Sequence, residues 1–556
     1  MPDFAARLRR LARSVAGPGA GRPAAGASAE QQERAEQVSA RLAELTEARD
    51  HEAAERLATE SFDELHDQPV FLRQVSQSTG RSGGLSLRVR ALEALVRIEQ
   101  GPKVAARLAV ARGRLRETDA AWTPTVPEAV VAALPPAQPP LPGRVVHVLK
   151  ISVPHRQSGY TMRGMYSLSG QARSGLDPVA VTALDFPEGA VPADGAAAGE
   201  LVEDVDGIPH VRLLRAAVPA EEPWDAYLDV WAAALAPVVA RYRPEVLHVH
   251  SGHRGYESAL VALTVGELLG VPVVYEVRGF FEALWSRDLA WAERSETYRR
   301  RRDTETRCMQ RAAAVVTLSE SMRQDILERG VDPATVHVVP NGVDTDVFTP
   351  RPRAAALTEQ LGLTDRFVFG YVSNLDHWRE GQELLVDAAV RLREQGVPAT
   401  ALIVGDGTRR AELEQLAERR GAGDAVVFTG KVPHDDVAAY YAQLDVFVVP
   451  RVDERAARLV TPLKPFEAMA QGLPLLVSDL PALNEITGDG SRGATFRAGD
   501  ADSLAQALLD LHADPQRRAA LAAAGREWVV AERQWSANGA RYREVYDQVA
   551  AARPPA

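Results

Sequence analysis

The stretch that decides the fold of this chain reads Thr461-Pro-Leu-Lys-Pro-Phe-Glu-Ala-Met-Ala-Gln-Gly-Leu-Pro-Leu-Leu-Val-Ser-Asp479. We expect Thr461 to cap a short helix, Pro462 to stiffen its start and Gly472 to end it. The apolar run at 475–477 then predicts a buried strand. A helix followed directly by a buried strand is typical of an α/β protein with a parallel sheet.

The start of this helix has the chemistry of a phosphate site. Its free N–H groups and its dipole favour an anion, and Lys464 adds a positive charge beside them. Glu467 lies in the first turn, where its carboxylate can accept hydrogen bonds from paired hydroxyls such as those of a ribose. The alternative is a helix with a capping glutamate and no ligand.

Composition narrows the class of protein. With 556 residues the chain is too long for one core and predicts two or three domains. The net charge of −11 argues against nucleic acid as a partner. The single cysteine, Cys308, excludes an internal disulfide and fits a reducing compartment, so we expect a cytoplasmic protein. No run approaches 18 apolar residues, which argues against a membrane span.

Residues 1–28 predict a basic amphipathic helix followed by a flexible linker. One helical face carries apolar side chains and the remainder carries four arginines: Phe4, Leu8, Leu11 and Val15 against Arg7, Arg9, Arg10 and Arg13. A helix of this kind binds the surface of an anionic membrane, or else docks on its own protein. The first reading makes the protein peripheral on the inner face of the membrane.

Residues 29–117 predict a helical extension without a chemical motif, which we interpret as a docking module. Residues 118–143 are rich in proline and predict a stiff linker. Strands alternating with helices then predict a first Rossmann-like domain over residues 144–341.

Polar side chains follow several strands of this first domain. His250 is the last residue of one expected strand, and Arg278 comes shortly after another. The first strand is followed by a loop with Gly159, Tyr160, Thr161 and Arg163. Ligands of open α/β sheets bind at the carboxyl ends of parallel strands. The loop is therefore an acceptor or phosphate loop, or else a plain turn from strand to helix.

A second alternating series predicts another Rossmann-like domain over residues 342–535, and a helix and tail over 536–556. Its strands are followed by loops that carry Ser373, Asn374, Gly405, Val432 and Arg451.

The residues from Thr461 to Asp479 resemble the donor motif of retaining family 4 glycosyltransferases, two glutamates seven residues apart followed by A-M-A-x-G-x-P-V. We call this stretch the donor motif. Pro340-Asn-Gly-Val-Asp344 is similar to the turn that joins the two domains of that family. The variant around Leu459 resembles a subgroup associated with exopolysaccharide and exosortase gene sets.

The resemblance implies a GT-B fold, with the first domain on the acceptor side of a cleft and the second on the donor side. It also implies transfer of a sugar, with retention, from a nucleotide-diphosphate sugar, a UDP- or GDP-sugar. It implies that Glu467 holds the ribose and that the backbone near Val432 holds the base. Ser373 and the helix start at Thr461, Pro462 and Leu463 would hold the diphosphate. No metal and no other cofactor is required if cations and N–H groups neutralise the leaving group. We take Arg278, His250 and Lys464 as catalytic candidates, and Gly405 as part of the donor site.

The chain departs from the family pattern at three positions. Leu459 replaces the first glutamate of the motif, and Asn374 and Glu380 replace an arginine and a lysine that contact phosphate. Two lost charge-assisted contacts of about 1.5–3 kcal/mol each require a replacement. Lys464, Arg379 and Arg451 are the candidates for a shifted phosphate site.

Two functions fit these observations. One is transfer to a saccharide or lipid-linked acceptor in the synthesis of cell-surface polysaccharide or glycoconjugate, or to a small acceptor such as an inositol phosphate. The other is a catalytically silent scaffold, which the three departures motivate. The base, the sugar, the acceptor and the oligomeric state are not determined by the sequence.

Overall fold

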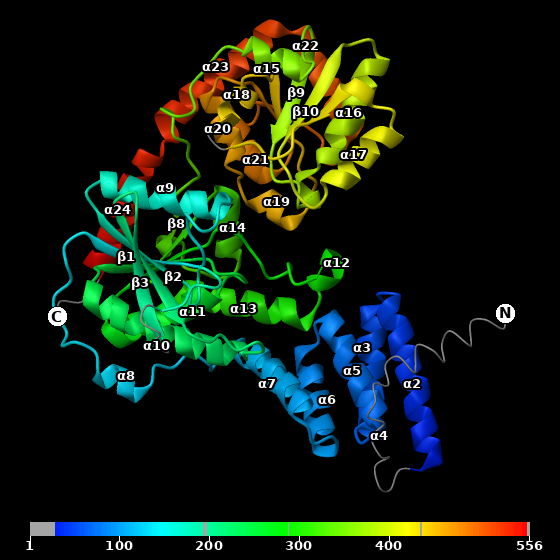
Figure 1. Cartoon of the computed structure of the whole chain (residues 1–556), viewed down its shortest axis with the longest axis vertical. Helices are drawn as coiled ribbons and strands as arrows, with labels where there is room; N and C mark the ends of the chain where they lie inside the picture. Colours follow the sequence, from blue (N-terminus) through cyan, green and yellow to red (C-terminus); the bar gives the residue numbers. More distant parts are fainter. Residues whose placement is uncertain (1–27, 193–195, 197, 287, 434–435, 553–556) are drawn as a thin grey trace. The chain divides into compact units, whose positions relative to one another are not determined.

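The computed structural model describes residues 28–192, 196, 198–286, 288–433 and 436–552, which form two compact units (Figure 1). The first unit comprises the chain up to Thr125 together with Val218–Val230 and Phe281–Glu305. The second comprises Val126–Ala217, Trp231–Phe280 and the chain from Thr306. The predicted membrane-binding helix at 1–16 lies outside the described residues.

The first unit is built of helices, in agreement with the predicted helical extension. Its helices are α2 (Ala29–Glu47), α3 (His51–Glu60), α4 (Phe62–Leu65), α5 (Pro69–Ser82), α6 (Leu85–Ile98), α7 (Pro102–Arg116) and α12 (Leu289–Ala292). Val38, Leu42 and Leu45 recur at helical spacing and are buried, because they face the core of the bundle. Among the described helices of the whole chain, none combines the length and the apolar character needed to cross a membrane.

A segment far along the sequence completes this bundle. Trp291 Nε1 donates to the Ser82 carbonyl at 2.7 Å, and Thr297 Oγ1 donates to the Gly83 carbonyl at 2.7 Å. Gly83 ends α5 with a φ of +83°, and a Cβ there would meet the Trp285 ring at 2.6 Å. The helical extension is therefore packed against residues 281–305, which the sequence pattern did not indicate.

The second unit contains two sheets, of which the first has eight strands in the order β3-β4-β2-β1-β5-β6-β7-β8. Its strands are β1 (Arg144–Leu149), β2 (Asp177–Thr182), β3 (Ala198–Val205), β4 (Ile208–Arg215), β5 (Val246–His250), β6 (Val273–Glu276), β7 (Ala314–Thr317) and β8 (Val336–Val338). The helices of this part are α8 (Glu128–Ala132), α9 (Gly159–Arg173), α11 (Glu257–Leu269), α14 (Glu320–Glu328) and the 3-10 turn η2 (Pro333–Thr335). The residues of α10 (Trp224–Tyr242) and α13 (Glu296–Arg311) are divided between the two units. All pairings are parallel except that of the edge strand β3.

The second sheet has six parallel strands in the order β11-β10-β9-β12-β13-β14. They are β9 (Phe367–Val372), β10 (Ala399–Val404), β11 (Val426–Phe428), β12 (Val446–Val449), β13 (Leu475–Ser478) and β14 (Ala494–Phe496). The helical elements are α15 (Ala355–Gln360), η3 (Trp378–Glu380), α16 (Gln382–Glu394), α17 (Arg410–Arg419), η4 (Gly423–Ala425), α18 (Val437–Tyr441), α19 (Arg455–Leu459), α20 (Lys464–Ala470), α21 (Pro481–Thr487), α22 (Ala501–Ala513), α23 (Pro515–Glu532) and α24 (Trp535–Ala551). Two doubly wound sheets are the predicted fold class.

Each sheet has one point where the strand order changes direction. In the first sheet it lies between β1 and β5, and in the second between β9 and β12. The loops that follow these four strands begin at Lys150, Ser251, Ser373 and Pro450. Ligands of open α/β sheets bind at such switch points, so we expect ligands to bind at these loops.

The last helix of the chain packs on the first sheet, although it follows the second. Tyr542, Val545, Tyr546 and Val549 of α24 share one buried core with strand residues such as Val145. The main chain therefore passes between the two sheets twice, after β8 and again before α24.

The loop that follows β10 packs closely against the loop that follows β9, and Gly405 lies at their contact. It has a φ of +138°, and a Cβ on it would lie 1.9 Å from the Ser373 carbonyl oxygen. We expect Gly405→Ala to lower the thermal midpoint by several degrees more than Gly396→Ala, because Gly396 has a φ of +78° and open space around it. Equal shifts in calorimetry would contradict this close approach of the two loops.

Candidate functional site

The donor motif places one acidic and one basic side chain together at the start of α20. Glu467 Oε2 accepts a hydrogen bond from the Tyr441 hydroxyl at 2.7 Å and lies 3.3 Å from Lys464 Nζ. The side chains of Glu467 and Lys464 are 12% and 33% exposed. Burial and the Glu467 charge raise the pKa of Tyr441 well above its ordinary value, so its hydroxyl remains a donor. The glutamate is held in one orientation before any ligand arrives.

Thr461 does not cap this helix, contrary to the prediction. Leu463 is the N-cap of α20 and makes no capping hydrogen bond, while Gly472 ends the helix region with a φ of +76°. Thr461 is 6% exposed, and its carbonyl accepts from Asn341 Nδ2 at 2.8 Å. Thr461 Oγ1, the group that would otherwise cap, accepts from the same Asn341 Nδ2 at 3.3 Å, and Pro462 separates Thr461 from the N-cap Leu463.

The loop after β9 carries three of the predicted donor residues. Ser373 Oγ accepts from Gln382 Nε2 at 3.1 Å, and the Asn374 side chain accepts from the Asp376 amide at 2.6 Å. The Arg379 side chain is 26% exposed, and its Nε lies 3.6 Å from Glu380 Oε1. Ser373 and Asn374 therefore order the loop, and Arg379 is a partly exposed cation on it.

Arg451 and Glu380 form a buried pair across the second switch point. Arg451 Nη2 lies 3.0 Å from Glu380 Oε1, and the Tyr371 hydroxyl donates to Glu380 Oε2 at 2.5 Å. Burial would raise the pKa of Glu380, but the Arg451 charge lowers it below its ordinary value. Arg451 also donates to the Val460 carbonyl at 2.8 Å. The guanidinium predicted to replace a phosphate contact is thus already neutralised by a carboxylate.

Gly405 and Val432 lie on the loops after β10 and β11. Gly405 forms a bridge with Gly430, and Val432 is partly buried against the core of the second sheet. They therefore lie at the same edge of the sheet as Ser373 and Arg379.

The predicted acceptor loop opens α9 through a capping box. Ser158 and Thr161 exchange hydrogen bonds between side chain and backbone, which satisfies donors at the first turn. Gly159 is exposed, and a Cβ on it would lie 3.9 Å from Leu463 Cδ1, so this loop reaches the donor motif. Thr161 is 1% exposed and acts within the cap.

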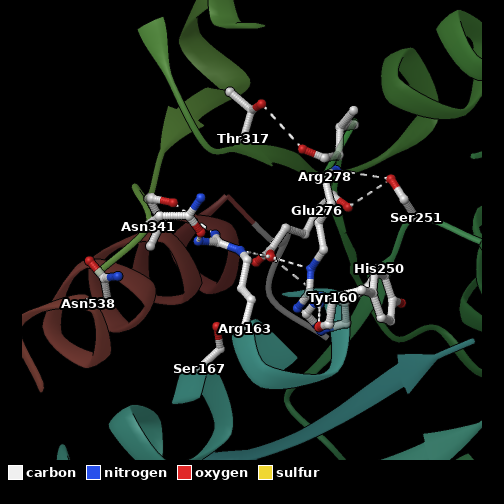
Figure 2. A network of polar contacts seen from close by, with 12 residues as sticks. Tyr160, Arg163, Ser167, His250, Ser251, Glu276, Arg278, Thr317, Asn341 and Asn538 are labelled. Atoms are coloured by element: carbon white, nitrogen blue, oxygen red, sulfur yellow. Dashed lines mark hydrogen bonds and ion pairs between the residues drawn. The ribbon is translucent and has the colours of Figure 1, made fainter. Parts of the chain in front are cut away.

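Arg163 and Arg278 meet on one carboxylate that the sequence reading left without a role (Figure 2). Arg163 Nε and Arg278 Nε donate to Glu276 Oε1 at 3.0 and 2.8 Å, and the Tyr542 hydroxyl donates to Oε2 at 2.6 Å. Arg278 Nη1 donates to the Tyr160 carbonyl at 2.9 Å. Burial alone would raise the pKa of Glu276, but the two guanidinium charges hold it well below its ordinary value.

His250 belongs to a stack of three buried imidazoles beside Glu276. His147 Nδ1 lies 2.9 Å from His250 Nε2, and His248 Nδ1 lies 2.5 Å from the Tyr546 hydroxyl. His248 Nε2 and His250 Nδ1 face the Glu276 oxygens at 3.3 and 3.5 Å. Burial lowers the pKa of all three histidines, so they are neutral at pH 7.

Hydrogen bonds fix the tautomers of two of these histidines. His147 Nε2–H donates to Gln171 Oε1 at 3.0 Å, so neutral His147 accepts at Nδ1 from His250 Nε2–H at 2.9 Å. Among the described residues, nitrogen atoms of His147, His248 and His250 also lie within 4.8 Å of one another, a grouping that could hold a metal ion. Arg163 and Arg278 on the same carboxylate oppose a further cation there, so we interpret the stack as a hydrogen-bonded network.

Residues that sequence reasoning missed are Glu276, His147, His248, Tyr441 and Tyr542. Glu276 lies at a strand end, and that position could have identified it, whereas His248 lies in the middle of β5. Tyr542 carried no signal, because its 266-residue separation from Glu276 is bridged only in the folded chain.

Two family models match the chain, and together they span more than half of it. Residues 158–342 match the glycosyl transferase 4-like domain, and residues 366–514 match glycosyl transferases group 1. Solved structures show the same fold: sucrose-phosphate synthase from Thermosynechococcus elongatus covers 74% of this chain and 100% of its own, with a TM-score of 0.58 and 23% identity. HepE from Anabaena, solved with UDP, covers 73% of this chain and 99% of its own, with a TM-score of 0.57 and 16% identity. The predicted GT-B fold is confirmed.

Curated relatives are similar over part of the chain. A GDP-mannose-dependent alpha-(1-6)-phosphatidylinositol monomannoside mannosyltransferase from Mycolicibacterium smegmatis is 38% identical over 216 residues, which are 38% of this chain and 56% of that protein. A D-inositol 3-phosphate glycosyltransferase from Thermobispora bispora is 29% identical over 66% of this chain and 83% of its own. A 2-deoxystreptamine N-acetyl-D-glucosaminyltransferase from Streptomyces fradiae is 29% identical over 52% and 68%. The chain spans less than two thirds of the mannosyltransferases that it matches.

The buried histidines predict a pH dependence of stability. Their folded pKa values lie below the ordinary value of 6.5, so the unfolded chain takes up protons first as the pH falls. Stability is therefore fully present above pH 6.5 and falls below it, by up to about 1.4 kcal/mol per pH unit for each histidine. We expect thermal midpoints measured from pH 7.5 to 5.5 to fall less steeply in His147→Gln than in the unmodified protein. Equal slopes would contradict a neutral, buried stack.

Proposed function

Because the chain belongs to the group 1 glycosyltransferases of family 4, we propose that it moves a sugar from a nucleotide-diphosphate sugar to a hydroxyl of a saccharide or inositol-type acceptor. The observation that carries the proposal is the fixed orientation of the Glu467 carboxylate in α20. It accepts hydrogen bonds from the Tyr441 hydroxyl and from Lys464 Nζ. A carboxylate fixed in this way can accept from the two ribose hydroxyls of a nucleotide.

GDP-mannose is the donor to test first. The relatives at 34–38% identity are named for GDP-mannose, and UDP-sugars are the alternative donors. The diphosphate would lie at the carboxyl edge of the second sheet, near the partly exposed cations Lys464 and Arg379. Their charges would stabilise the leaving diphosphate as the bond to the sugar breaks.

The acceptor is proposed to be a lipid-linked saccharide or inositol in the synthesis of a cell-surface polysaccharide or glycoconjugate. Three of the relatives are named for acceptors with inositol or 2-deoxystreptamine, which are both cyclic polyols. A free inositol phosphate is the small alternative. Transfer is proposed to retain the anomeric configuration, with the departing phosphate accepting the acceptor's proton. The exosortase-associated subgroup stays a prediction.

A Glu467→Ala variant tests the donor site. We expect GDP or UDP at a hundred times its dissociation constant to add about 2.7 kcal/mol of stability to the unmodified protein, which raises the thermal midpoint by several degrees. The rise should disappear in Glu467→Ala and persist in Glu418→Ala, which removes an exposed glutamate of α17. The same pair is then assayed with GDP-mannose and acceptor, with the anomeric configuration of the product read by NMR.

The outcomes separate the two functions. Turnover with retention supports the transferase. Nucleotide binding without turnover of any donor, or no binding at all, favours the silent scaffold that Leu459, Asn374 and Glu380 motivated.

The N-terminal residues are proposed to bind the inner surface of an anionic membrane. The four arginines at 7, 9, 10 and 13 each contribute about 1 kcal/mol near such a surface. We expect deletion of residues 1–16 to weaken binding to phosphatidylglycerol vesicles at least tenfold in flotation assays. Binding to neutral phosphatidylcholine vesicles is the control, and unchanged binding to the anionic vesicles would exclude this role.

A further inference from the structure

We propose that Glu276 is a positioning residue for sugar transfer, because its carboxylate joins the acceptor loop to the donor motif through a continuous buried chain of contacts. The turnover part of this inference rests on the proposed function. We call Glu276, Arg163, Arg278, Tyr542 and Asn341 the Glu276 network. Figure 2 shows Glu276 between the two arginines, with Asn341 beside Arg163.

The first arm of the network runs from Glu276 to the acceptor loop. Arg278 Nε donates to Glu276, and its Nη1 donates to the Tyr160 carbonyl at 2.9 Å, in the first turn of α9. The Arg278 guanidinium lies 4.6 Å from the centre of the Tyr160 ring, which fixes the plane of the guanidinium as well. The backbone amide of Arg278 donates to Ser251 Oγ at 3.0 Å. The carboxylate thus sets where α9 begins.

The second arm runs to the segment that leaves the first sheet. Arg163 donates to the Val339 carbonyl at 2.8 Å and to Asn341 Oδ1 at 2.9 Å. Asn341 Nδ2 then donates to the Thr461 carbonyl at 2.8 Å, at the start of the donor motif. Arg163, Asn341 and Thr461 are 2%, 3% and 6% exposed, so water does not replace these bonds.

The third arm fixes the returning helix. The Tyr542 hydroxyl of α24 donates to Glu276 at 2.6 Å, and Asn538 Nδ2 of the same helix donates to the Pro340 carbonyl at 2.8 Å. The Glu276 carboxylate is thus linked to both segments that connect the two sheets, the one after β8 and the one before α24.

Stability alone does not account for this arrangement. A buried carboxylate paired with two arginines contributes little net stability compared with apolar side chains of similar volume. We therefore infer that Glu276 serves to fix a specific geometry. A displacement of about 1 Å at reacting groups costs on the order of a hundredfold in rate, and the network holds both sides of the proposed reaction.

The test compares Glu276→Gln with Glu203→Gln. Glu203 also accepts from a buried arginine, Arg212, at 2.8 Å, but it lies on the edge strand β3 away from the network. We expect Glu276→Gln to lower kcat at saturating substrates about a hundredfold, with nucleotide affinity changed less than threefold. The Glu203→Gln variant should keep kcat within threefold. Asn341→Ala combined with Glu276→Gln should add little to the larger single effect, because the two residues act in one chain.

A second measurement does not depend on turnover. Hydrogen–deuterium exchange of the segment 459–470 should become at least tenfold faster in Glu276→Gln and stay unchanged in Glu203→Gln. Unchanged exchange at 459–470 would overturn the coupling, and so would a kcat that falls only in proportion to the folded fraction measured by circular dichroism. If the unmodified protein turns over no donor, the proposed function fails while the exchange result still decides the coupling.

Discussion

A carboxylate that is fully buried has to be satisfied entirely by protein groups, and Glu276 imposes this constraint on the second unit. Its side chain is 0% exposed. An uncompensated charge in such a place would cost several kcal/mol. The folded state therefore requires the two guanidinium groups and the tyrosine hydroxyl all to contact the carboxylate. These partners come from α9, from the end of β6 itself and from α24, which follows the second sheet. The return of the last helix to the first sheet is thus tied to the same charge that fixes the start of α9.

The parallel sheets supply the second constraint, because the carboxyl ends of their strands lie on one edge. The residues discussed as donor ligands follow β9, β10, β11 and β12 or begin α20, and those of the acceptor side follow β1, β5 and β6. The strands are otherwise mostly buried apolar runs, and the polar side chains within them, His147, His248 and Tyr371, are hydrogen-bonded inside the protein. A catalytic role for Lys464 needs only its partial exposure, whereas His250 and Arg278 are 1% and 6% exposed and would act through their neighbours.

Strands of this kind could be predicted from sequence, and the pairings of side chains could not. The buried strands predicted next to His250 and before Ser373 coincide with β5 and β9, because burial on both faces leaves continuous apolar segments. The hairpin of β3 and β4 escaped prediction since no residue of β3 is fully buried and the strand carries Glu200, Glu203 and Asp204. Glu276 and Arg163 are 113 residues apart, so no local pattern could join them. The capping role expected of Thr461 was wrong for the same reason, because Asn341 reaches it only in the folded chain.

The departure from the family pattern at Glu380 is compensated by Arg451, which pairs with it. A carboxylate at a position expected to hold a phosphate-binding lysine would repel a diphosphate if it were free. Here it is buried with Arg451 and bonded by Tyr371, so the pair presents almost no net charge to the edge of the sheet. The pair also donates to the Val460 carbonyl, next to the donor motif, and so fixes the segment that precedes Lys464. Under the proposed function, the substitution would exchange a direct phosphate contact for a rigid support. Neutralisation of a leaving diphosphate would then fall to Lys464 and Arg379, whose side chains remain partly exposed.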